Sequence, residues 1–146
     1  MSENPFSSFN VEMPKKYDER VRQFCATSGR GRAGELAPFG RQIDFWFTAF
    51  IIAAKKRLDP IDESDTYNVT PASILSTDPY RITHIQSVFL SFTNDIDGLA
   101  DDRKVFDFSI RLTNAGIPFL IQILDESDLK PIWNITDYLD AALKKR

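Results

Sequence analysis

Two arginines stand between glycines in residues 28–34, the segment whose composition comes closest to a phosphate-binding loop. Gly29, Gly31 and Gly34 approximate the G-x-G-x-x-G pattern of dinucleotide-binding loops. That pattern must follow a strand, whereas the residues before Gly29 predict a helix, so the dinucleotide interpretation fails. The flanking glycines would let Arg30 and Arg32 lie along a phosphate backbone, and the same composition is typical of a solvated linker. Both interpretations stay open.

Catalysis or metal binding would need partner residues that the sequence does not supply. The chain contains one histidine, His84, and one cysteine, Cys25, so it cannot form the His and Cys sets that hold zinc. We expect Cys25 to be a small buried residue on an apolar helix stripe, and His84 to lie in solvent or at the core edge. No spacing pairs two carboxylates in one cleft. The sequence predicts no catalytic residue, no metal, no cofactor and no enzymatic activity.

Charge is divided unevenly along the 146 residues, whose formal net charge is −3. Residues 1–57 hold ten basic and six acidic residues, residues 58–143 hold five basic and fifteen acidic residues, and the last three residues are basic. This division fits a basic face for a polyanion, and it also fits a solvated surface on which the two parts interleave. The residues expected to contact phosphates on a basic face are Arg30, Arg32, Arg41, Lys55, Lys56 and Arg57.

Positioning these residues requires a fold, and the hydrophobic spacing predicts an all-α one. The length and the 42% hydrophobic content fit one compact domain. We expect residues 1–12 to form a flexible lead-in and residues 13–146 to form a single-domain bundle of five or six helices. The apolar positions of residues 41–58 nearly encircle the helix axis, which predicts a central place in the core.

The other expected elements follow from apolar stripes, prolines and glycines. Residues 119–124 are ambiguous, because their length and isoleucine content fit a short buried strand as well as two helical turns. The sequence Asn114-Ala115-Gly116 is expected to end the helix before them. The remaining helices are expected over residues 14–28, 71–75, 79–96 and 99–115, and from a cap at Asn134 or Thr136 onward.

Cellular location is predicted from what the chain lacks. Its longest apolar stretch, residues 45–54, is far shorter than the roughly 20 residues that cross a bilayer. The first ten residues are polar, unlike a signal peptide. A single cysteine fits a reducing compartment. We therefore expect a soluble cytoplasmic protein without membrane association.

Two segments resemble a known family. Residues 37–49, A-P-F-G-R-Q-I-D-F-W-F-T-A, resemble the Pro-Phe, Asp and aromatic-alanine helix of small proteins associated with bacterial DNA phosphorothioation (Dnd) systems. Residues 108–124, with Asn114-Ala115-Gly116 and the apolar residues after it, resemble that family's helix ending and its continuation. The resemblance implies a role beside enzymes that modify or restrict DNA, with no catalytic residues of its own.

Two hypotheses on function follow. The first is a non-enzymatic accessory protein of a bacterial DNA-modification or anti-phage defence system, which acts by binding a protein partner. The second is a small DNA-binding or regulatory module, in which the six basic residues named above make weak, non-specific contacts with phosphates.

Overall fold

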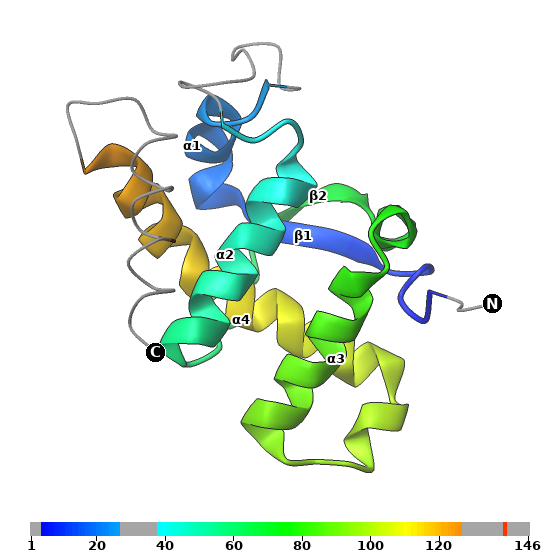
Figure 1. Cartoon of the computed structure of the whole chain (residues 1–146). Coiled ribbons are helices and arrows are strands. Elements are labelled where there is room, and N and C mark those ends of the chain that lie inside the picture. The colour runs from blue at the N-terminus through cyan, green and yellow to red at the C-terminus, as the bar shows by residue number, and fades with distance from the viewer. Residues whose placement is uncertain (1–3, 27–37, 127–138, 140–146) are drawn as a thin grey trace.

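The computed structural model describes residues 4–26, 38–126 and 139. Within these residues the fold combines helices with a two-stranded antiparallel sheet, so the expectation of an all-α fold is wrong (Figure 1). The strands are β1 (Asn10–Pro14) and β2 (Thr66–Pro71). The α-helices are α1 (Asp18–Gln23), α2 (Gln42–Lys56), α3 (Tyr80–Thr93) and α4 (Asp102–Asp125), and the 3-10 helices are η1 (Lys15–Tyr17), η3 (Ala72–Thr77) and η4 (Gly98–Ala100).

Strand β1 replaces the end of the expected lead-in and the start of the expected first helix. Val11 and Met13 are fully buried, whereas Asn10 is exposed and Glu12 is half-buried, as in a strand with one face on the core; Pro14 at the strand end is buried as well. Pro14 lies opposite Thr66 in the sheet, so helix α1 begins only at Asp18, after η1. Phe6, also in the expected lead-in, is fully buried with its ring centroid 5.2 Å from that of Phe106. The described part of the first 12 residues thus contributes two side chains, Phe6 and Val11, to the core.

Helix α2 confirms the prediction of a central helix. Eight of its 15 residues are buried, including Trp46 and Phe50, and α4 crosses it closely. The helix ends at Arg57, whose left-handed φ of 55° directs its backbone N–H to the carbonyl groups of Ala53 and Ala54. The outer side of α2 is less completely buried than its sequence indicates, because Ile51 is only half-buried.

Helix α4 corrects two further expectations. It continues through Gly116 and Pro118 to Asp125, so the helix does not end at residues 114–116, and residues 119–124 are helix and not strand. Gly116 is placed against α2, where a Cβ atom would lie 2.2 Å from the carbonyl oxygen of Ala49. The glycine therefore permits a close helix crossing instead of ending the helix. Burial of Ile117, Leu120 and Leu124 after the glycine offsets the hydrogen bond that Pro118 cannot donate.

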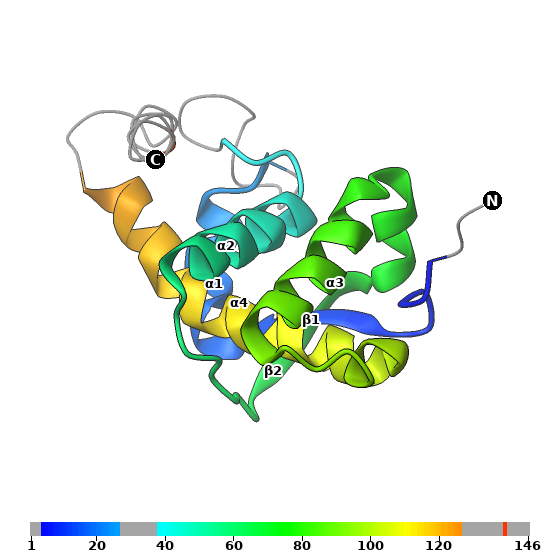
Figure 2. The same ribbon diagram turned by 60° about the horizontal axis from the view of Figure 1, so that its bottom comes forward.

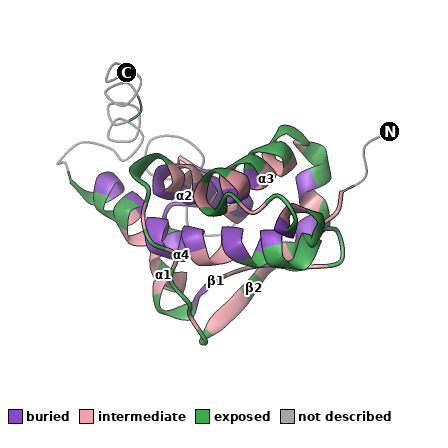
Figure 3. Ribbon diagram, turned by 90° about the horizontal axis from the view of Figure 1, so that it is seen from below, coloured by how far each residue is buried: buried purple, intermediate pink, exposed green. Residues whose placement is uncertain are grey.

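Helix α4 lies between helices α2 and α3 on one side and the sheet on the other (Figure 3). Helices α2 and α3 lie side by side over α4 (Figure 2), and the two strands lie on its other side (Figure 3). Buried residues line the surfaces where these layers meet, whereas the outer side of α3 is largely exposed (Figure 3). This arrangement leaves one side of α3 available to solvent along its whole length.

Candidate protein-interaction surface

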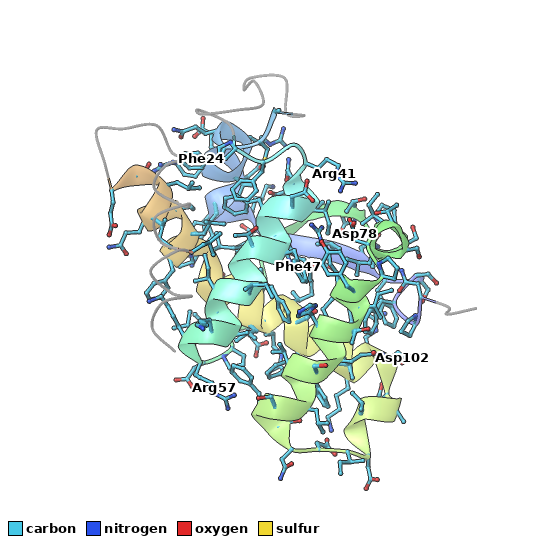
Figure 4. All side chains as sticks on the ribbon, in the orientation of Figure 1. Phe24, Arg41, Phe47, Arg57, Asp78 and Asp102 are labelled. Atoms are coloured by element: carbon cyan, nitrogen blue, oxygen red, sulfur yellow. The ribbon has the colours of Figure 1, made fainter. Side chains whose placement is uncertain are left out.

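The described residues of the expected basic face lie at opposite ends of helix α2. Arg41 precedes α2 and Lys55–Arg57 end it, so the 15-residue helix, about 22 Å long, separates them (Figure 4). The Arg41 guanidinium lies 3.2 Å from an oxygen of Asp44 and 3.8 Å from one of Asp78, which offset its charge locally. Arg30 and Arg32 lie outside the described residues.

The basic end of α2 packs partly against aromatic rings. Arg57 lies with its guanidinium carbon 4.0 Å from the ring centroid of Phe92 and donates a 3.0 Å hydrogen bond to the Ser91 hydroxyl. The Lys56 ammonium lies 5.4 Å from the ring centroid of Phe119. Lys55, Lys56 and Arg57 are all exposed. This end of the helix therefore carries a compact group of three cations, apart from Arg41.

Cys25 and His84, whose side-chain types can act in catalysis, lie in different environments. Cys25 is fully buried, and this burial raises the pKa of its thiol to about 12, with a smaller contribution from the charge of Asp44. His84 is exposed on α3, with Nδ1 2.8 Å from the carbonyl oxygen of Tyr80 and its ring edge-on to Phe47. Neither side chain has a nucleophile–base geometry, and the described residues contain no group of three or more possible metal ligands.

The clearest surface feature is a long segment almost without charge. Between Asp65 and Asp95 the only charged residues are Asp78 and Arg81, although 27% of the chain is charged. The segment forms β2, η3 and α3, and every exposed residue in it is uncharged. We call these exposed residues the uncharged surface. They are Asn68, Pro71, Ser73, Ser76, Thr77, Pro79, Tyr80, Thr83, His84, Ser87, Ser91, Thr93 and Asn94.

The two charged residues of the segment are engaged in ion pairs at its edge. The Arg81 side chain is only 12% exposed, donates to a carboxylate oxygen of Asp44 at 3.1 Å and stacks its guanidinium carbon 4.8 Å from the Phe47 ring centroid. Asp78 faces Arg41, as noted above, and both lie near the start of α2 (Figure 4). These contacts fix α3 against α2 and keep the two charges away from the exposed side of α3.

A hollow of about 470 Å³ borders the uncharged surface, between α3, the N-terminal segment and the start of α4. Tyr80, which is 53% exposed, forms one wall. Asp102 is the single charged residue in the lining. The remaining lining residues are Pro5, Pro79, Ile82, Thr83 and Gln86.

The sequence interpretation concentrated on basic residues and missed this surface. The signal was present, because the printed sequence shows only two charged residues, Asp78 and Arg81, between Asp65 and Asp95. What the sequence could not show is that Asp78 and Arg81 find partners on the preceding helix. Unless these ion pairs are known, the segment resembles an ordinary polar surface that contains charged residues.

Comparisons with known proteins identify no relative from which a function could be transferred. No protein-family model matches the chain, and neither a curated protein nor a solved structure does. Among the described helices, none has the length and apolar character needed to span a membrane. A proposal on its function therefore has to start from the sequence and the surface of the chain itself.

Proposed function

We propose that this chain is a non-enzymatic accessory protein that binds a protein partner through the uncharged surface. The supporting observation is that every exposed residue from Asn68 to Asn94 lacks a charge. Charged residues are depleted in the centres of protein interfaces, because each buried charge must be desolvated, and tyrosine is enriched there. Tyr80 projects from this surface with half of its area exposed.

The other described surfaces lack this property. The first turn of α4 exposes Asp102, Arg103 and Lys104 in succession, and the end of α2 exposes Lys55–Arg57. A partner that covered either of these regions would have to compensate several charges at once. The exposed residues of η3 and α3 carry no charge of their own. The charges beside them are Arg57, which contacts Ser91, and Asp102, which lines the hollow next to Tyr80. A partner on this side would therefore have fewer charges to compensate, which favours it as the docking side.

The biological setting of the proposal comes from the resemblance of residues 37–49 and 108–124 to proteins of DNA phosphorothioation systems. On this basis we propose that the chain acts in the cytoplasm beside an enzyme that modifies or restricts DNA in a bacterial defence system. Helix α2 and the crossing segment of α4 then supply the core that holds the docking surface. The proposed role requires no reacting group from either helix.

Direct DNA binding is a second candidate, favoured only by the three exposed cations at residues 55–57. Three phosphate contacts would give weak binding with a shallow dependence on salt. Fluorescence anisotropy with an arbitrary duplex tests this: the double variant Lys55→Glu, Arg57→Glu should abolish any binding seen at low salt. Binding that is strong, selective for sequence or unaffected by the double change would contradict this candidate.

The proposed function is tested by affinity capture with a charge placed on the surface. Ser87 is exposed in the middle of α3, so Ser87→Glu should greatly reduce recovery of the partner from the native host. The matched control is Ser64→Glu, an exposed serine between α2 and β2 outside the uncharged surface, which should leave recovery unchanged. The proposal is wrong if both variants recover the same proteins as the wild-type chain.

The identity of the recovered protein tests the setting separately. A partner that modifies or cleaves DNA supports the defence role. A partner of another class, lost with Ser87→Glu, would leave the docking surface in place and refute the defence role.

A further inference from the structure

The hollow beside α3 has the composition of a site for one side chain. Its volume of about 470 Å³ falls within the range of small-ligand pockets. Pro79, Tyr80 and Ile82 give it apolar and aromatic walls from the start of α3, Pro5 closes it from the N-terminal segment, and Asp102 lies at the start of α4. Figure 4 shows Asp102 beside α3. Three parts of the chain that are distant in sequence thus build one concavity.

Three polar side chains in the hollow have hydrogen-bonding capacity to spare. Within the described chain, the Thr83 hydroxyl, the Gln86 amide and the Asp102 carboxylate make no side-chain hydrogen bond or ion pair. The neighbouring acids differ, because Asp95 binds Lys104 at 2.8 Å and Asp101 accepts the backbone N–H of Lys104. The Asp102 carboxylate is therefore available to a ligand from outside the chain.

Charge and shape together point to a guanidinium group. A cation is required to match Asp102, the one charged lining residue. A planar guanidinium stacks well on an aromatic ring and on proline, and it can donate to a carboxylate and an amide oxygen at the same time. Tyr80 provides the ring, and Asp102 and Gln86 provide the acceptors. A lysine ammonium would use the carboxylate but would gain less from the flat walls.

We propose that this hollow is an arginine-binding pocket, which receives one arginine side chain of the protein partner. The proposal rests on the proposed function, since it names the anchor of the same partner at the edge of the uncharged surface. The arginine stem packs against Tyr80, Pro79 and Ile82, and its guanidinium pairs with Asp102. Specificity in an otherwise uncharged interface then comes from a single ion pair at the edge of α3.

The test uses small-molecule probes and the whole chain, so it needs no identified partner. N-acetyl-arginine amide is titrated into the protein and followed by two-dimensional amide NMR. The signals of Tyr80, Thr83, Gln86 and Asp102 should shift together in a saturable way. The corresponding citrulline amide, which has nearly the same shape and no charge, should bind at least about tenfold more weakly.

Two variants assign the binding to the pocket. Asp102→Asn keeps the size of the side chain and should weaken arginine-amide binding at least about tenfold. Asp97→Asn removes a charge from the same acidic loop but lies outside the lining, and it should change binding by less than about twofold. An unchanged amide spectrum in the absence of probe establishes that each variant is folded.

The proposal is overturned if the shifts fall elsewhere, if the citrulline or lysine amides bind as tightly as the arginine amide, or if Asp102→Asn has no effect. Such a failure is distinct from failure of the proposed function. Loss of partner capture with Ser87→Glu, together with absence of arginine-amide binding, would keep the docking surface and remove its arginine anchor. If the arginine amide binds and Ser87→Glu leaves partner capture unchanged, the arginine-binding pocket is kept and the docking surface is refuted.

Discussion

Gly116 is the residue on which the close crossing of α2 and α4 depends most directly. Gly116→Ala would place a Cβ 2.2 Å from the Ala49 carbonyl oxygen and 3.0 Å from the Ala53 Cβ, so the helices must move apart. We expect the free energy of unfolding to fall by about 1–3 kcal/mol, despite the higher helix propensity of alanine. Urea denaturation measures this loss.

Gly40 supplies the matched control for that substitution. A Cβ at Gly40 would meet no atom within 4 Å, so Gly40→Ala should leave the denaturation midpoint close to that of the wild-type chain. Equal midpoints for Gly116→Ala and the wild-type chain would show that the crossing is looser than the structure has it.

Cys25 predicts how stability depends on alkaline pH. Burial raises the pKa of its thiol to about 12, and burial also raises the pKa of the Tyr67 hydroxyl. An unfolded thiol ionises near pH 8.5, so the folded state retains a proton that the unfolded state loses. The contribution of the thiol to the free energy of unfolding should therefore be constant below about pH 8 and fall above it, by up to about 1.4 kcal/mol per pH unit.

Urea denaturation between pH 7 and pH 10.5 checks this dependence. Cys25→Ala lowers stability at every pH by leaving a small cavity, and it should also flatten the alkaline slope. An equal slope in the variant and the wild-type chain would remove Cys25 as its origin.

At the scale of elements, long apolar stripes were predictable and short or interrupted elements were not. The sequence predicts helices α2 and α3 because apolar residues recur in it at helical spacing over several turns. Strand β1 has five residues and is stabilised by β2, more than 50 positions away, so no local signal marks it. Gly116 and Pro118 are local signals for a helix end, and tertiary packing against α2 overrides them.

The core position of α2 is tested by two neighbouring substitutions. Phe50 is fully buried, so Phe50→Asp should cost more than about 4 kcal/mol and leave the chain unfolded. Ile51 is half-buried on the outer side, so Ile51→Asp should give a folded protein with a modestly lower Tm. Circular dichroism melting distinguishes the two results. A cooperative Tm near the wild-type value for Phe50→Asp would mean that α2 is not central.

At the scale of the whole molecule, the division of charge along the sequence does not persist in space. Ion pairs join the basic first part of the chain to the acidic remainder, as in Lys16–Glu63, Arg20–Asp125 and Arg41–Asp78. Of the residues expected to form a basic face, Arg41 pairs with Asp44 and Asp78 and lies at the opposite end of α2 from Lys55, Lys56 and Arg57. Composition could reveal the imbalance but not these long-range pairs, which depend on the fold. The uncharged surface is the larger-scale feature that remains.

Hydroxyl-radical footprinting of the complex isolated from the native host tests most directly whether this surface docks a protein. Tyr80 and His84 on the uncharged surface are exposed in the free chain, and so are Ile61 and Phe119 elsewhere. All four side chains react with the radical, so Ile61 and Phe119 serve as internal controls. We predict that partner binding protects Tyr80 and His84 and leaves Ile61 and Phe119 unchanged. Protection of Phe119, beside Lys56, with Tyr80 and His84 still reactive would contradict the proposed docking surface.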